Sequence, residues 1–281
     1  MLCKVIFASA LLCALIFTAK AHQAAWSKGM YCMKGLPGKD DINNMLPVFP
    51  QYMLKKEDWW FQHERGCDQA PPPAGHYLEL PAGDSFTVEI AQNRAFTTFG
   101  KNSKFNDFYG GPQQLVRGED RCVIGPNLHT PSQHLAPGTV FAISYQNSID
   151  NVTPENLVVF TVRYHTPWQR LTMYDVPKDL PPCPPGGCTC AWGWIPMGCG
   201  QPNMYMQGHK CIVTNSTSNK RLAVAKPPVY CEDDPSKCVK GAKQMIFYQQ
   251  LDGNNVINPP KMPTYNARMG FEDGAQNDIF E

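Results

Sequence analysis

The sequence predicts a mainly β protein, an immunoglobulin-like antiparallel β-sandwich with long disulfide-pinned loops. Short stretches of alternating apolar and polar residues are separated by Pro-, Gly- and Asn-rich turns rather than by long amphipathic helical patterns. The chain also holds ten cysteines beyond its first 21 residues, enough to pin several loops. Strands, frequent turns and cross-linked loops together favour a sandwich over a helical or doubly wound fold.

The alternation places individual elements along the chain. Strands are expected at residues 85–90, 139–145, 157–164, 211–214 and 245–248. Short helices are expected at residues 58–63 and 153–156. Residues 253–281 lack cysteine and a convincing apolar pattern, so we predict a disordered, mobile tail after a main domain at residues 22–252.

Residues 1–21 have the pattern of a secretory signal peptide. They combine a positive charge at Lys4, an apolar core over residues 5–18 and a small-x-small cleavage site at residues 19–21. The apolar run is too short to span a bilayer. An uncleaved anchor, or a cut one residue away, is the alternative. Cleavage after Ala21 would make His22 the first residue of a secreted mature chain.

The remaining chain has little net charge. Removing 21 of the 281 residues leaves 260, which can bury a sizeable core. Lys4 and Lys20 would leave with the signal, so 23 of the 25 basic residues remain against 24 acidic ones. This balance argues against nucleic acid and membrane surfaces as partners, and we expect a soluble monomer. Sequons at Asn151 and Asn215 predict N-glycosylation.

The cysteines indicate an oxidising compartment. Cys3 and Cys13 leave with the signal, and the even remainder indicates five disulfides whose pairing stays open: Cys32, Cys67, Cys122, Cys183, Cys188, Cys190, Cys199, Cys211, Cys231 and Cys238. A zinc site around Cys188 and Cys190 is the competing interpretation.

A histidine at the mature N-terminus can bind one metal ion through two nitrogens, its α-amine and its ring Nδ1. Copper(II) favours tetragonal nitrogen coordination, so a three-nitrogen site built on His22 suits copper. The third nitrogen must come from an internal histidine: His63, His76, His129, His134, His165 or His209. His129 and His134 are favoured because they lie in a polar loop, although a loop histidine is more often simply solvated. Tyr205 is a candidate axial oxygen donor, with an ordinary packed tyrosine as the alternative.

Six longer segments of the chain are distinctive. They are His22-Gln-Ala-Ala-Trp-Ser-Lys-Gly-Met-Tyr-Cys32, Trp59-Trp-Phe-Gln-His-Glu-Arg-Gly-Cys67-Asp68, Asn93-Arg-Ala-Phe-Thr-Thr98, Tyr164-His-Thr-Pro-Trp168, Asp175-Val-Pro-Lys-Asp-Leu-Pro-Pro-Cys183 and Gly200-Gln-Pro-Asn-Met-Tyr-Met-Gln207. Together they resemble fungal lytic polysaccharide monooxygenases of auxiliary activity family 14. The similarity runs from His22 to about Leu251.

The resemblance implies a secreted oxidoreductase that cleaves xylan, chiefly xylan coating cellulose in lignocellulose. It implies one copper ion in a histidine brace of His22 and His129, with Tyr205 axial. Tyr205 and Gln207 would act at the reacting centre, and His165 also matches the pattern. An external electron donor and O2 or H2O2 complete the reaction. Whether His129 or His134 is the internal ligand stays open at this stage.

An attached polysaccharide needs a flat contact surface. Aromatic residues in expected loops could stack on sugar rings, namely Trp26, Tyr31, Phe108, Tyr109 and Trp192. The pair Trp59-Trp60 is assigned to the core.

Two other classes of function are considered. The first is a secreted copper-binding protein with the same brace and no oxygenase activity. The second is a glycosidase using two carboxylates drawn from Asp58, Glu64, Asp68, Glu89 and Glu119, although nothing in their spacing sets two of them apart.

Overall fold

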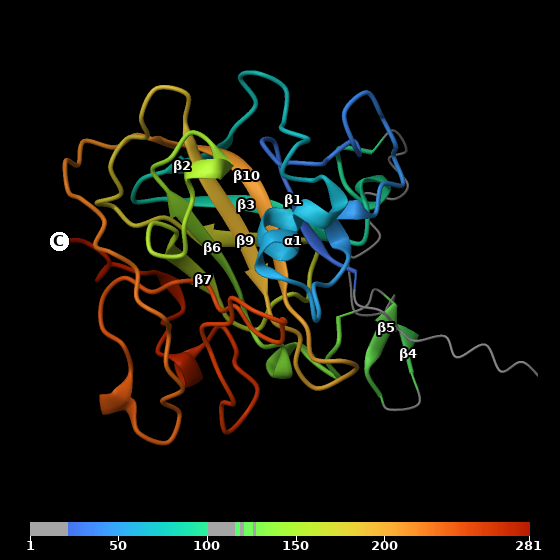
Figure 1. The fold of residues 1–281 in the computed structure, drawn as a ribbon, viewed down its shortest axis with the longest axis vertical. Helices are drawn as coiled ribbons and strands as arrows, with labels where there is room; N and C mark the ends of the chain where they lie inside the picture. The colour runs from blue at the N-terminus through green and yellow to red at the C-terminus, as the bar shows by residue number, and fades with distance from the viewer. Residues whose placement is uncertain (1–21, 101–115, 119–120, 126–127) are drawn as a thin grey trace, which may run out of the picture.

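The computed structural model describes residues 22–100, 116–118, 121–125 and 128–281 as short strands joined by long irregular loops (Figure 1). The expected signal peptide lies outside these residues. So do Phe108, Tyr109 and Glu119, which were candidates for sugar contact and for catalysis by carboxylates.

The strands are β1 (Ala24–Trp26), β2 (Leu78–Pro81), β3 (Ser85–Ala91), β4 (Val116–Arg117), β5 (Val123–Gly125), β6 (Thr139–Ser144), β7 (Val158–Arg163), β8 (Leu171–Asp175), β9 (Cys188–Trp194), β10 (Tyr205–Thr214) and β11 (Gly274–Ala275). One α-helix, α1 (Lys56–Trp59), precedes the 3-10 helix η2 (Trp60–Arg65). Other 3-10 turns are η1 (Leu46–Val48), η3 (Arg94–Phe96), η6 (Gln133–Leu135), η7 (Ile149–Asn151), η8 (Pro235–Lys237) and η9 (Ala267–Met269).

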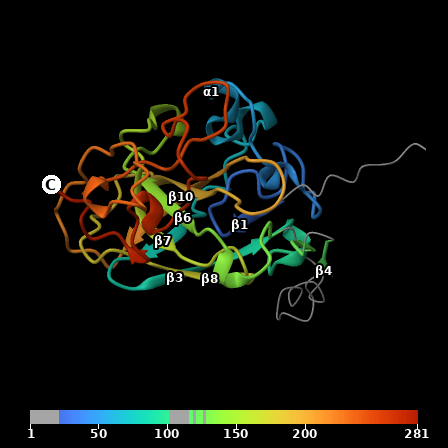
Figure 2. The ribbon, with the colours of Figure 1, turned by 90° about the horizontal axis from the view of Figure 1, so that it is seen from below.

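Two sheets pack face to face. One has the strand order β1-β3-β8 and the other β11-β7-β6-β9-β10-β2, while β4 and β5 form a separate pair. Figure 2 shows β3 and β8 on one side of β6, β7 and β10, with α1 on the far side of the larger sheet. Neighbouring strands run antiparallel except β10 and β2, which are parallel. The predicted β-sandwich is therefore confirmed, with one parallel edge strand that the sequence did not predict.

The main core lies between the two sheets. Phe86 of β3 stacks on Tyr174 of β8 at 5.6 Å between ring centroids and meets Phe141 of β6 edge-on at 5.1 Å. Trp192 of β9 is fully buried among them and donates from its indole nitrogen to the Tyr174 hydroxyl at 3.2 Å. Large aromatic side chains thus join the two sheets across this core.

The outer face of the larger sheet is also buried. The C-terminal part of the chain covers it, and Tyr265, Met269 and Phe271 are at most 1% exposed there. Residues 274–275 pair with β7 as strand β11. The prediction of a mobile tail at residues 253–281 is therefore wrong. Its buried side chains follow neither a twofold nor a 3.6-residue period, so their pattern gave no signal.

The expected elements agree with the structure in part. Strands β3, β6 and β7 match their predicted ranges, and residues 211–214 are the end of the longer β10. Residues 245–248 form no strand, because their main chain is bonded to side chains instead: Ile246 N–H donates to the Tyr265 hydroxyl and Phe247 N–H to Asn255 Oδ1. Residues 58–63 fall within α1 and η2, whereas residues 153–156 are a turn. Strand β9 is buried along its whole length and shows no alternation.

The ten cysteines form five disulfides: Cys32–Cys67, Cys122–Cys199, Cys183–Cys188, Cys190–Cys211 and Cys231–Cys238. Cys190–Cys211 joins the paired strands β9 and β10, and the other four pin loops. The zinc interpretation is wrong, because Cys188 and Cys190 each belong to a disulfide.

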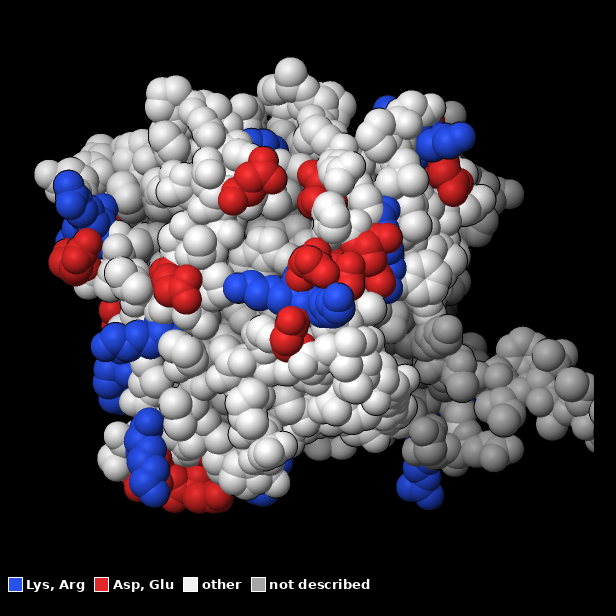
Figure 3. Space-filling view, viewed as in Figure 1, with Lys and Arg blue, Asp and Glu red and all other residues white. Residues whose placement is uncertain are grey.

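The surface carries charges of both signs. Figure 3 shows basic and acidic side chains in mixed groups on one face. In one such group of the molecule, Glu232 accepts from Lys261 at 2.8 Å and from Arg268 at 3.2 Å. Within the described ranges, no helix has the length and apolar character needed to cross a membrane.

Candidate metal centre

His22 lies directly before strand β1. It is 8% exposed, and its ring meets the ring of Phe49 edge-on at 4.7 Å between centroids. Two residues later, Ala24 pairs with Ala91 in the smaller sheet. The start of the sheet therefore fixes the path of the chain at His22, and Phe49 limits the rotation of its imidazole.

His129 lies in a turn with its backbone in the left-handed region, at φ 52°. Its ring Nδ1 is 2.5 Å from the carbonyl oxygen of Cys199. A carbonyl can only accept a hydrogen bond, so Nδ1 carries a proton, and in the neutral ring the lone pair is then on Nε2. Metal-ligating histidines commonly donate their other N–H in this way, which fixes ring orientation and tautomer. The Cys122–Cys199 disulfide ties the accepting residue to the strand region that precedes His129.

His134 has a different environment. Its ring stacks on that of His165 at 5.1 Å, and His165 Nδ1 lies 3.0 Å from the His134 carbonyl oxygen. Both residues are exposed. The two imidazoles thus form a surface pair, whereas His129 is 6% exposed and oriented by a main-chain carbonyl.

Tyr205 is the first residue of β10 and lies opposite Trp194 of β9 in the ladder. The two rings stack at 4.8 Å, and the Trp194 indole also meets the His129 ring edge-on at 6.1 Å. Tyr205 and His129 therefore contact the same indole. Burial holds the pKa of the Tyr205 hydroxyl well above its ordinary value, and the nearby Arg65 guanidinium partly opposes that rise.

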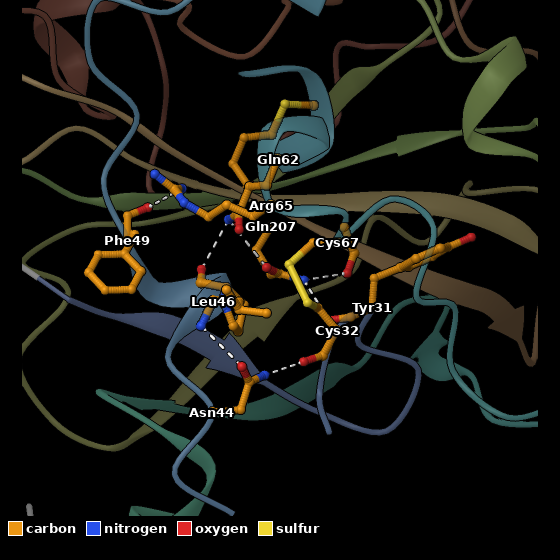
Figure 4. The surroundings of a disulfide bond; sticks show 12 residues. Tyr31, Cys32, Asn44, Leu46, Phe49, Gln62, Arg65, Cys67 and Gln207 are labelled. Carbon is orange, nitrogen blue, oxygen red and sulfur yellow. Dashed lines mark hydrogen bonds between the residues drawn. A yellow bond between two sulfur atoms is a disulfide. The ribbon is translucent and has the colours of Figure 1, made fainter. Parts of the chain in front are cut away.

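Arg65 is a residue that the sequence did not single out. Its Nη1 and Nη2 donate to the carbonyl oxygens of Phe49 at 3.2 Å and Pro50 at 3.1 Å, and its guanidinium lies 5.4 Å from the Phe49 ring centroid (Figure 4). Phe49 in turn contacts His22, and Arg65 interacts electrostatically with Tyr205. This one cation links the surroundings of His22 to those of Tyr205. The chain segments that hold Arg65, His22 and Tyr205 meet only in the folded protein, so no local sequence pattern could have indicated the role of Arg65.

Gln207 is 1% exposed and its amide is engaged with main chain. Its Nε2 donates to the carbonyl oxygens of Tyr31 and Gly208, each at 3.0 Å, and the Gln62 amide nitrogen lies 3.4 Å from its Oε1 (Figure 4). These contacts hold β10 against the segment that follows β1.

The remaining histidines lie in other settings. His63 is exposed and its Nδ1 lies 2.8 Å from Asp68 Oδ2. His209 is fully buried with its Nδ1 3.0 Å from the Ser27 hydroxyl, and burial lowers its pKa to about 3, so it stays neutral. His76 is exposed on a loop.

Three of the aromatic residues proposed to stack on sugars are core residues. Trp26 and Trp192 are 0% exposed and Tyr31 is 4% exposed, so that prediction is wrong for them. The Trp26 indole donates to the Ala91 carbonyl inside the sheet at 2.9 Å. The core assignment of Trp59 is confirmed, while its neighbour Trp60 remains partly exposed.

Three of the five candidate carboxylates are each paired with a different basic residue. Glu64 pairs with Arg65, Asp68 with His63 and Glu89 with Arg170. The structure therefore offers no specific support for two of them acting together in the hydrolysis of a glycosidic bond.

The available donors fit copper better than a harder or softer ion. In the part of the chain that the structure describes, no three His, Cys, Asp or Glu side chains gather as a metal site. The hydrogen bond from His129 to the Cys199 carbonyl uses Nδ1 of the ring. The imidazoles of His22 and His129, with the terminal amine that cleavage after Ala21 would expose, would form a nitrogen set that suits copper(II).

Comparisons with known proteins agree with one family. The family model described as Lytic polysaccharide monooxygenase AA14 matches residues 3–281. AA14 family lytic polysaccharide monooxygenase B of Trametes coccinea (strain BRFM310) is 36% identical over 272 residues, covering 92% of this chain and 62% of that protein. The B protein of Talaromyces rugulosus is 37% identical over 278 residues, covering 94% of each chain. The chain thus spans less than two thirds of the Trametes relative and nearly all of the Talaromyces one.

Proposed function

Because this chain belongs to the AA14 family of lytic polysaccharide monooxygenases, we propose that it oxidatively cleaves xylan, above all xylan coating cellulose. The family is copper-dependent and uses O2 or H2O2 with an external reductant. The observation that best supports a copper site here is the hydrogen bond from His129 Nδ1 to the Cys199 carbonyl, which presents Nε2 as a ligand.

In this proposal, His22 and His129 hold the copper. Cleavage after Ala21 frees the α-amine of His22, which then binds together with its ring Nδ1. That amine must lose a proton first, and its free pKa is roughly 7.7–8.0, so copper binding releases protons and weakens in acid. Phe49 restrains the His22 ring, and Arg65 restrains Phe49.

Tyr205 is proposed as a further residue that would hold the copper, through its phenol oxygen. Its stacking on Trp194 fixes the direction of the phenol, and burial keeps the hydroxyl protonated as a weak oxygen donor. Gln207 is proposed to hold β10 in place through the main chain of Tyr31, and so to fix the position of Tyr205 two residues earlier. Copper, when bound, supplies the redox centre at which the co-substrate is activated.

The bond cleavage follows from where the oxygen is inserted. Hydroxylation of the C–H beside the glycosidic oxygen places two oxygens on one carbon. That carbon expels the glycosidic oxygen as an alcohol, and the polysaccharide chain breaks with one oxidised end.

We also propose that the protein is secreted as a glycosylated monomer. The family resemblance, the five disulfides and the signal-like residues 1–21 support an exported chain. Asn151 and Asn215 are both exposed, as glycan acceptors must be.

The test uses the mature chain that begins at His22. Copper-loaded protein is incubated with ascorbate and xylan-coated cellulose, and soluble products are analysed by mass spectrometry. Oxidised xylo-oligosaccharides are expected, and they should disappear without copper or reductant. Tight copper binding with no oxidised product would instead identify a copper-binding protein, and unoxidised products formed without copper or reductant would identify a hydrolase.

A further inference from the structure

A cleft lies between two exposed loops. Residues 33–39 and 70–76 contribute the walls of a cleft of about 640 Å³. The Cys32–Cys67 disulfide and the hydrogen bond from Cys32 N–H to the Ala70 carbonyl, at 2.8 Å, join the bases of both walls (Figure 4). Asn44 Nδ2 also donates to the Cys32 carbonyl at 2.5 Å, which closes the first loop. The cleft is therefore held open by covalent and main-chain links.

The lining of this cleft is mostly apolar. Met30, Met33, Leu36 and Phe99 face it, together with Pro37 and residues 71–73, which are all proline. Leu36 is 40% exposed, so apolar surface is left in contact with water. Proline has no N–H to donate, so these walls offer a sugar few of the hydrogen bonds that its hydroxyls require.

The charged residues of the cleft are basic. Lys28, Lys34, Lys39 and Arg94 line it. Arg94 is only 3% exposed and is bonded to Asp40 through Nη2 at 2.5 Å, while its Nε has no hydrogen-bond partner among the described residues. Asp40 also lies 3.9 Å from Lys34. One carboxylate therefore faces several cations, and the cleft carries an excess of positive charge.

We propose that this cleft binds a small aryl carboxylate. The aromatic ring of the ligand lies against Met33, Leu36 and the prolines. The lysines bind its carboxylate, and the Arg94 guanidinium moves slightly to bind it as well. The aryl ring of such a ligand can pack against the apolar walls of the cleft. Its carboxylate can pair with the basic side chains. The proposal is independent of the copper chemistry, because no residue of the cleft belongs to the proposed metal centre.

The test uses the copper-free full mature chain and trans-cinnamate as the probe, measured by isothermal titration calorimetry. Cinnamamide has the same ring without the charge, and glucuronate has a carboxylate without the aryl group. We expect cinnamate to bind about tenfold more tightly than cinnamamide, because a charge-assisted hydrogen bond is lost without the carboxylate. We expect a similar margin of about tenfold over glucuronate, because glucuronate has no aryl ring to bury against the apolar walls.

Two surface variants check the location. Lys39→Gln should weaken cinnamate binding roughly three- to fivefold, as for an exposed ion pair. Leu36→Ser should also weaken it, and neither side chain is needed for folding because both are exposed. Lys240→Gln, an exposed lysine outside the cleft, should leave it unchanged. Equal binding of cinnamate and cinnamamide, tighter binding of glucuronate, or insensitivity to both cleft variants would overturn the proposal.

Discussion

The ring of His129 is oriented by the main-chain carbonyl of Cys199, 2.5 Å from its Nδ1. This contact fixes the tautomer, presents Nε2 and depends on a loop that Cys122–Cys199 ties back to the chain preceding the histidine. Cys199, whose sulfur is in a disulfide, thereby orients a proposed metal ligand through its main-chain carbonyl.

The disulfide that holds Cys199 should matter for copper. Replacing both Cys122 and Cys199 with serine should lower Cu(II) affinity by about 10–100-fold, the usual effect of losing a partner that orients a ligand. Calorimetric titration of the mature protein measures this. The matched control replaces both Cys231 and Cys238, which pin a different loop. Equal effects from the two double variants would show that the first acts only through general stability.

The internal ligand can be identified by one pair of substitutions. His129→Ala should lower Cu(II) affinity more than any other single internal histidine change, because it removes one of three nitrogens. His134→Ala should change it little, since His134 stacks on His165 at the surface. The opposite ranking would move the ligand assignment to His134.

Arg65 should support the centre without binding metal. Arg65→Met removes two charge-assisted hydrogen bonds to carbonyls, so we expect a loss of about 2–4 kcal/mol in the free energy of unfolding. Released from Phe49, the His22 ring should also give a broadened Cu(II) electron paramagnetic resonance spectrum. Arg65→Lys keeps the positive charge but loses the guanidinium whose two nitrogens bond both carbonyls. It should therefore restore only part of the stability and only part of the sharpness of the Cu(II) spectrum. An unchanged spectrum in Arg65→Met would limit this residue to a role in stability.

Stability should fall in acid because of His209. Burial lowers its pKa to about 3, below the unfolded value of roughly 6.5, so the unfolded chain binds more protons between these limits. The free energy of unfolding should therefore drop as pH falls through this window, by up to about 1.4 kcal/mol per pH unit. Urea unfolding from pH 7 to pH 4 measures the slope, which should be shallower in His209→Gln. An identical slope in that variant would contradict the prediction.

The C-terminal segment should be essential to the fold. Phe271 is 1% exposed against the larger sheet, so Phe271→Ala should cost about 3–5 kcal/mol of stability. Ile257→Ala is the matched control in the same segment, because Ile257 is 67% exposed and should cost less than about 0.5 kcal/mol. The melting temperatures of both variants measure this difference. If the C-terminal segment were a dispensable tail, both variants would melt at the wild-type temperature.

The features that could be predicted from sequence are those that leave a local pattern. Alternation located β3, β6 and β7, and the even cysteine count indicated five disulfides. Strand β9 gave no such signal because it lies in a stretch rich in Pro, Gly and Cys that is typical of a loop, and the segment around Phe271 gave none because it covers a sheet without regular structure. The buried Trp26 and Trp192 also looked like loop residues.

In the candidate site, too, the sequence indicated some residues, and others could be found only from the fold. His22, His129 and Tyr205 were singled out from cleavage chemistry, loop composition and family resemblance. Arg65 and Phe49 were not, since their relation to His22 arises only where distant segments meet. The stacking of Trp194 on Tyr205 likewise depends on the pairing of β9 with β10, and the same indole meets His129 edge-on.

The central claim is that the freed N-terminus of His22 completes a copper site with His129. Cu(II) titration of two chains tests it directly, one beginning at His22 and the other retaining Ala21 before it. The first should bind one equivalent with a spectrum of three nitrogen ligands, and the second should bind at least about a hundredfold more weakly, having lost the terminal amine from the chelate. Equal affinity and identical spectra from the two chains would contradict the histidine brace.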